Sequence, residues 1–194
     1  MNYDTIKEEI KDIDITLPPP QEEPERQYYF IKKLQHWMEL KKEEKGRELT
    51  CCVNTFGCQM NARDSEKIIG ILMTIGYKVV EDEDADLVIF NTCTVRENAN
   101  LKVYGRLGQL KKIKNKNPEM ITMLCGCMMQ EESVVEKIKK SYRNVDIIFG
   151  THNIFKFAEL LSMKVLDRAE SKKMIIDVWK DTTEIVEELP VERK

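Results

Sequence analysis

Two runs of consecutive apolar residues constrain the fold of this chain of 194 residues more than any other feature. They are LVIFN at 87–91 and MITMLC at 120–125, and neither shows the alternation of a strand with one exposed face. Short runs of this kind are typical of parallel strands that are covered on both faces. A segment with helix-like periodicity follows each run, so the order of elements favours an α/β domain.

The chain alternates in the same way from residue 49 onward. Further strands are predicted over 50–56, 77–80 and 146–149, and helices over 62–75, 98–116, 133–141 and 153–166. The pattern weakens beyond residue 172, where only MIIDVW at 174–179 is compatible with a strand. Ser133 and Asn153 are the expected N-caps of the last two helices. Only residues 81–86 separate the strand at 77–80 from the next one, so it is expected to be a short edge strand. We predict an open, mostly parallel sheet with helices on both faces, a three-layer arrangement of the flavodoxin or Rossmann type.

The first 48 residues differ from the rest and are interpreted as an N-terminal extension. Four of the six prolines lie between residues 18 and 24 among acidic residues, so residues 1–24 are predicted to be flexible or only locally ordered. Apolar residues recur at helical spacing within 25–45, which predicts an amphipathic helix that ends near Gly46 and docks on a domain at 49–168. Residues 169–194 end on charges without a helix cap and are expected to be a linker.

Composition excludes several classes of protein. No apolar run approaches the roughly 18 residues of a membrane span, and residues 1–14 lack the basic-then-apolar pattern of a secretion signal. The chain is therefore expected to be cytoplasmic, without membrane contact, and its six cysteines to be thiols or metal ligands rather than disulfides. The formal net charge of -3 means that any RNA contact needs a local basic patch.

The six cysteines fall into two groups by their position. Three lie inside predicted strands and are interpreted as small core residues: Cys51, Cys52 and Cys125. Cys58, Cys93 and Cys127 instead follow the predicted strands by one to three residues. Ligands bind outside the carboxyl ends of parallel strands, so these three thiols are expected to converge on one soft-metal site.

The spacing of the three strand-end cysteines limits the kind of site. Cys58 and Cys93 are 35 residues apart and Cys93 and Cys127 are 34 apart, so each belongs to a different loop. A zinc ribbon would need close cysteine pairs, whereas three thiolates without a fourth protein ligand suit an iron-sulfur cluster with one open iron. Two other interpretations stay open: a zinc or structural module that uses the same thiolates, and a flavin-binding module whose strand-end loops hold a phosphate.

Five motifs occur in order between about Thr50 and Leu161: TFGCQMNARDSEK, DADLVIFNTCTVRENA, VYGRLGQLKKIK, CGCMMQ and DIIFGTHN. This stretch resembles the N-terminal domain of the radical S-adenosylmethionine methylthiotransferases. GCQMN is similar to the branch that adds a methylthio group to C2 of N6-isopentenyladenosine at position 37, next to a tRNA anticodon. Sister branches, which act on threonylcarbamoyl adenosine in tRNA or on a ribosomal protein aspartate, differ after this first cysteine.

The resemblance implies that Cys58, Cys93 and Cys127 bind an auxiliary 4Fe-4S cluster whose open iron carries the sulfur to be transferred. It also implies that S-adenosylmethionine methylates this sulfur, and that a second 4Fe-4S cluster cleaves another S-adenosylmethionine to a radical. The C-x-x-x-C-x-x-C motif for that second cluster is absent from this sequence, as is the RNA-binding barrel of the family. The chain is thus expected to be an N-terminal portion of a monomeric transferase that acts on a tRNA anticodon stem-loop, and to be inactive alone.

Other polar residues are assigned less specific roles. Asn61, Asn91 and Arg96 are candidates for hydrogen bonds to cluster sulfides, although the two asparagines equally suit turn caps. Asp64 and Glu66 are expected near the positive start of a helix, and His36 and His152 at the surface. The basic residues of 98–116 are either a solvated face or a stripe that contacts tRNA phosphates: Lys102, Arg106, Lys111, Lys112, Lys114 and Lys116.

Overall fold

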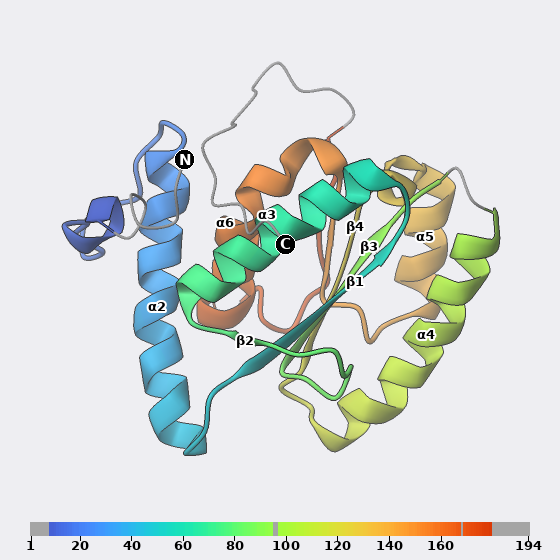
Figure 1. Cartoon of the computed structure of the whole chain (residues 1–194), viewed down its shortest axis with the longest axis horizontal. Helices are drawn as coiled ribbons and strands as arrows, with labels where there is room; N and C mark the ends of the chain where they lie inside the picture. The colour runs from blue at the N-terminus through green and yellow to red at the C-terminus, as the bar shows by residue number, and fades with distance from the viewer. Residues whose placement is uncertain (1–7, 95–96, 168, 180–194) are drawn as a thin grey trace.

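The computed structural model describes residues 8–94, 97–167 and 169–179. Within them, six strands form a single parallel sheet in the order β2-β1-β3-β4-β5-β6 (Figure 1). The strands are β1 (Thr50–Phe56), β2 (Lys78–Val79), β3 (Leu87–Thr92), β4 (Ile121–Cys125), β5 (Ile147–Phe149) and β6 (Ile175–Asp177). The predicted α/β fold with a parallel sheet is confirmed.

Helices cover both faces of this sheet. They are α2 (Glu25–Lys45), α3 (Gln59–Ile75), α4 (Glu97–Lys116), α5 (Glu132–Ser141) and α6 (Phe157–Leu166), with short 3-10 helices η1 (Cys127–Gln130) and η2 (Thr151–Lys156). Leu87 and Ile89 face the layer of α2, α3 and α6, whereas Val88 and Phe90 face α4 and α5. Figure 1 shows α2 and α6 on one side of the sheet and α4 and α5 on the other. All six residues of β3 are buried, as expected of a strand between two helical layers.

The predicted amphipathic helix at 25–45 is confirmed as α2, which ends at Gly46 with a left-handed φ of 63°. Its apolar side packs on the domain, with Leu34 fully buried and Phe30 8% exposed. Arg26 anchors its first turn to α6, because its Nε and Nη2 donate hydrogen bonds to the Glu159 carboxylate at 3.1 and 2.5 Å. The extension is thus held on the domain by both packing and an ion pair.

Part of the segment that the sequence predicts to be flexible packs on the core. Ile10 is 2% exposed and belongs to the same apolar cluster as Tyr29, whose hydroxyl donates to the Ile15 carbonyl oxygen at 3.2 Å. Residues 1–7 of that segment lie outside the described residues, as do 180–194 of the predicted linker. The division into extension, domain and linker stays a prediction.

The predicted edge position of the strand at 77–80 is confirmed, and its length explains the short connection that follows it. β2 has only two residues, which pair with Thr50 and Cys51 at the start of β1. The first residue of β3, Leu87, also pairs with Cys51. The end of β2 and the start of β3 therefore lie at nearly the same level along β1. The seven residues 80–86 are enough to connect them, although a crossover between longer parallel strands needs a dozen residues or more.

Two predicted helix caps are wrong. The N-cap of α5 is Glu131, and Ser133 is already the second residue of the helix. Asn153 lies inside η2, where its Oδ1 accepts a hydrogen bond from the Gly150 N–H at 2.9 Å, and α6 begins only at Phe157. Among the described residues, no helix is long and apolar enough to cross a membrane.

Candidate functional site

The three strand-end cysteines lie at the carboxyl ends of three neighbouring strands, since β3 lies between β1 and β4. Cys58 follows β1 by two residues, Cys93 follows β3 directly, and Cys127 follows β4 by two residues. Phe56 pairs with Thr92 and Asn91 with Cys125, so the three strands end at nearly the same height. The structure therefore brings the three loops to one edge, as the spacing predicts.

Cys58 is the N-cap residue of α3, with an extended backbone and an exposed side chain. Backbone N–H groups of Asn61 and Met60 at the start of the helix lower the pKa of the Cys58 thiol, and a hydrogen bond with the Cys93 thiol adds to this. Thiolates, not thiols, bind metals, so the helix start favours the ligating form. The helix begins at Gln59 rather than 62, and its first turn holds no acidic residue. The predicted helix-start position of Asp64 and Glu66 is therefore wrong.

Cys93 and Cys127 are joined to the neighbouring loops by backbone contacts. Cys93 is 2% exposed, and its N–H donates to the Phe56 carbonyl oxygen at 3.0 Å. Cys127 is half-buried at the start of η1, and its thiol donates to the Thr92 carbonyl oxygen at 3.6 Å. Each loop of the site thus contacts the loop from the neighbouring strand.

Glycines before two of the cysteines let these loops come close. Gly126 has a left-handed φ of 98°, and a Cβ placed on it would lie 2.2 Å from the Thr92 carbonyl oxygen. A Cβ on Gly57 would lie 2.3 Å from Asn61 Oδ1. Both distances are far below van der Waals contact, so a larger residue at 126 would push the β3 and β4 loops apart, and one at 57 would displace the Asn61 side chain.

Asn61 and Asn91 form a buried network beneath the cysteines. Asn61 Nδ2 donates to Asn91 Oδ1 at 3.0 Å and to the Thr92 carbonyl oxygen at 3.2 Å. Asn91 Nδ2 donates to the Asn61 carbonyl oxygen at 2.8 Å and to Ser65 Oγ at 3.0 Å. Asn61 Oδ1 also accepts the Cys58 N–H at 3.2 Å. Both amides donate to protein oxygens, which fits turn capping rather than hydrogen bonds to a cluster; Arg96, the third candidate, lies outside the described residues.

The other cysteines are core residues, as predicted. Cys51, Cys52 and Cys125 lie in strands and are at most 1% exposed. Burial raises the pKa of Cys51 to about 12 and that of Cys52 to about 11, and raises the pKa of Cys125 well above its ordinary value. These thiols are therefore uncharged at neutral pH and face the apolar layers.

Within the described part of the chain, no three His, Cys, Asp or Glu side chains gather closely enough to hold a single metal ion. The Cys58 and Cys93 thiols share a hydrogen bond, while Cys127 contacts the residue before Cys93. The three thiols thus line one edge without closing on a common point. His36 and His152 are exposed, as predicted for surface residues.

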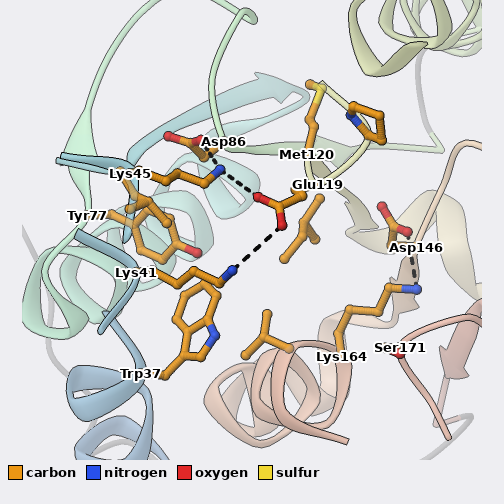
Figure 2. Close-up of a pocket in the computed structure, with 14 residues that line it drawn as sticks. Trp37, Lys41, Lys45, Tyr77, Asp86, Glu119, Met120, Asp146, Lys164 and Ser171 are labelled. Atoms are coloured by element: carbon orange, nitrogen blue, oxygen red, sulfur yellow. Dashed lines mark hydrogen bonds and ion pairs between the residues drawn. The ribbon is translucent and has the colours of Figure 1, made fainter. Parts of the chain in front are cut away.

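The opposite, amino-terminal edge of the sheet holds a cavity of about 270 Å³ that the sequence does not predict. Its lining includes residues that directly precede strands, among them Leu49, Tyr77 and Met120. Figure 2 shows Glu119 between the side chains of Lys41 and Lys45, with which its carboxylate pairs at 3.6 and 3.0 Å. The residues that line this cavity come from many separate segments of the chain, so no local sequence motif indicates it.

The six basic residues of 98–116 do not form one free stripe. Lys114 forms an ion pair with Asp146 and donates to the Asn144 carbonyl oxygen at 3.1 Å. Arg106 Nε donates to the Glu83 carboxylate at 2.8 Å. Lys114 and Arg106 are thus held by carboxylates, and the choice between a solvated face and a phosphate-contacting stripe concerns the other four residues, which are exposed.

Comparison with known proteins identifies relatives of this chain. A family model described as "Uncharacterized protein family UPF0004" matches residues 50–150. A tRNA-2-methylthio-N(6)-dimethylallyladenosine synthase of Lachnoclostridium phytofermentans is 65% identical over 152 residues, which are 78% of this chain and 32% of that protein. Proteins of the same name from Acetivibrio thermocellus and Clostridioides difficile are 48% and 46% identical over 89% and 90% of this chain, and over 35% and 36% of their own lengths.

The chain spans about a third of the length of these relatives. The family match, in contrast, takes in just over half of the chain and includes all three strand-end cysteines. The resemblance noted from the five motifs is confirmed. The chain belongs to the UPF0004 family, the N-terminal domain of the methylthiotransferases.

Proposed function

We propose that this chain is the cluster-binding part of a tRNA methylthiotransferase. The complete protein would add a methylthio group to C2 of N6-isopentenyladenosine at position 37, with S-adenosylmethionine and a second 4Fe-4S cluster in the part outside this chain. The names of the three relatives support this activity. The part in hand would hold the auxiliary 4Fe-4S cluster.

One observation carries the proposal: Cys58, Cys93 and Cys127 follow three neighbouring parallel strands at one edge. The hydrogen bond between the Cys58 and Cys93 thiols, and the contact of Cys127 with Thr92, keep the thiols at that edge. Ligand sites of open α/β sheets lie outside such strand ends. The remaining cysteines lie inside strands and belong to the two core layers.

The donor set fits a cluster better than a single ion. A structural zinc ion needs four ligands, with sulfurs about 2.3 Å from one centre, and the described residues contain no such group. A 4Fe-4S cluster with one open iron needs only three cysteines, which is the number that lies at this edge of the sheet. When bound, such a cluster supplies the iron-sulfur chemistry from which sulfur is donated.

The residues of this chain prepare that edge. Cys58 is exposed, and backbone N–H groups of Asn61 and Met60 lower the pKa of its thiol, which eases formation of the thiolate. Cys93 is buried, and its N–H donates a hydrogen bond to the Phe56 carbonyl oxygen, so its backbone is held in place against the end of β1. Asn61 links the Cys58 N–H to Thr92, which holds the first loop at a fixed distance from the second.

The test measures iron and acid-labile sulfide in the anaerobically reconstituted chain. We expect about four of each per chain, and loss of most of the iron in Cys58→Ala, Cys93→Ala and Cys127→Ala. Cys52→Ala is the matched control, because it removes a thiol from the same sheet but from the core. Circular dichroism checks that each variant is folded. Iron content that stays equal in all four variants would rule the assignment out, and stoichiometric zinc without sulfide would favour the zinc module instead.

A further inference from the structure

The face formed by α4 and the end of α5 carries exposed cations that have no ion-pair partner among the side chains the structure describes. They are Lys111, Lys112, Lys116, Lys137 and Arg143. The chain as a whole has a formal net charge of -3. Free cations concentrated on one face of an acidic chain mark that face as a site for a polyanion.

Aromatic side chains lie in the same face, between the two helices. Tyr104 of α4 and Tyr142 after α5 are stacked, with ring centroids 5.6 Å apart and an interplanar angle of 16°. Lys137 Nζ lies 4.0 Å from the centroid of the Tyr104 ring. Both tyrosines are half-buried, so the stacked pair presents a partly exposed aromatic surface beside the lysines. Aromatic rings next to cations are the usual components of RNA-binding surfaces.

Two glycines leave the backbone of α4 uncovered on the side of the helix that faces away from the sheet. Gly105 and Gly108 lie at helical spacing with the exposed Leu101 and Lys112, and a Cβ on either glycine would meet nothing within 4 Å. Packing inside the chain therefore does not require glycine here, although glycine weakens a helix relative to alanine. Two glycines in such a position let another backbone approach the helix axis closely.

We propose that the outer face of α4, with the adjoining end of α5, binds the phosphate backbone of RNA. The proposal rests on the proposed function, in which tRNA is the substrate. Lys111 and Lys112 contact phosphates, and the strand passes over Gly105 and Gly108. α4 begins shortly after Cys93 and, at 20 residues, extends about 30 Å from the cysteine edge (Figure 1). RNA along this face therefore leads to the proposed cluster site.

The first test uses the full chain and a fluorescein-labelled 17-nucleotide RNA hairpin, with binding followed by anisotropy at about 50 mM salt. Lys111→Glu with Lys112→Glu should weaken binding at least about tenfold and make its salt dependence shallower. The matched control is Lys172→Glu with Lys173→Glu, which makes the same charge change at two exposed lysines before β6. This control should stay within about twofold of the unchanged chain.

The second test separates close approach from charge. Gly105→Gln with Gly108→Gln adds bulk to the outer line of α4 without changing charge, and a melting curve should show an equal or higher Tm. The same hairpin should bind about fivefold more weakly. Unchanged binding by this variant would contradict passage of the RNA backbone over the glycines.

Other outcomes overturn the proposal as a whole. The proposal fails if the unchanged chain does not bind RNA at low salt, or if the lysine variant binds RNA with unaltered affinity. It also fails if polyglutamate binds more tightly than the hairpin, which would assign the face to an acidic protein. Iron content measured on the same samples keeps the two proposals apart. If the chain holds iron but the lysine variant binds RNA as tightly as the unchanged chain, only the RNA-binding inference is contradicted. If the chain binds RNA through α4 but holds no iron, only the cluster assignment is contradicted.

Discussion

The thiol of Cys127 donates a hydrogen bond to the carbonyl oxygen of Thr92 at 3.6 Å, and Thr92 directly precedes Cys93. The Thr92 hydroxyl in turn donates to the Cys125 carbonyl oxygen at 2.8 Å. The ends of β3 and β4 are thus joined on both sides of Gly126. Any change that separates these two ends should disturb two of the three proposed ligands together.

Gly126→Ala should separate them. The variant forces a left-handed φ on alanine and places its Cβ against the Thr92 backbone, so we expect a loss of about 2 to 3 kcal/mol in the free energy of unfolding. Urea denaturation measures it. Gly108→Ala is the matched control, because its Cβ meets nothing and should stabilise α4 by up to about 1 kcal/mol. Equal stability of the two variants would contradict the close approach at Gly126.

Asn91→Ala should weaken both the fold and the site. It removes the acceptor for Asn61 Nδ2 and the donor to Ser65 Oγ inside a fully buried network, so about 2 kcal/mol of stability should be lost. Asn115→Ala on the exposed side of α4 changes the same residue type and should be nearly neutral. Reconstituted iron content should fall in Asn91→Ala alone, and full iron in both variants would show that the network does not position the cysteines.

Acid should destabilise the chain through Asp86. Burial alone would raise the pKa of this carboxyl, but hydrogen bonds from Arg47 and the Thr50 N–H, together with the charges of Arg47 and Lys45, lower it to about 2. The folded-state pKa lies below the unfolded value, so the stabilisation is present above pH 4 and is lost as the pH falls towards 2. A shift of this size corresponds to about 2 kcal/mol, and because half of the Arg47 side chain is exposed, solvent screening should reduce the measured contribution to about 1 kcal/mol.

Unfolding free energies of the unchanged chain and of Asp86→Asn, measured from pH 6 down to pH 2, check this. The difference in unfolding free energy between the unchanged chain and Asp86→Asn should become smaller as the pH falls. Asp84→Asn, at an exposed position in the same loop, should follow the unchanged chain throughout. A difference between the unchanged chain and Asp86→Asn that does not vary with pH would contradict the assignment to Asp86.

The chain with its cluster reconstituted should not cleave S-adenosylmethionine. Its sequence lacks the C-x-x-x-C-x-x-C spacing that the radical chemistry of the family needs. We expect no 5'-deoxyadenosine by liquid chromatography after incubation with dithionite and S-adenosylmethionine, while iron content stays near about four per chain. Detection of that product above the level of a Cys58→Ala control would show that radical cleavage occurs in this part.

The placement of the cysteines could be predicted because it depends on local patterns. Buried runs locate β3 and β4, and the parallel order of the strands then brings their ends to one edge, so the sequence places Cys93 and Cys127 just after strands and Cys125 inside one. The sequence does not indicate the start of α3, because cysteine is an uncommon N-cap and Cys58 takes that role here. Local patterns also do not show that a cation is paired with a carboxylate from a distant segment, as Lys114 is with Asp146.

The position of β6 has a practical consequence for shortening this protein. β6 lies beyond residue 168, where the sequence places the end of the domain, yet Ile175 and Ile176 pair with Ile147 and Ile148 of β5. A truncated form that stops at residue 168 would leave the fully apolar β5 as an open edge, which invites aggregation between molecules. Expression work should therefore retain the chain at least through Asp177.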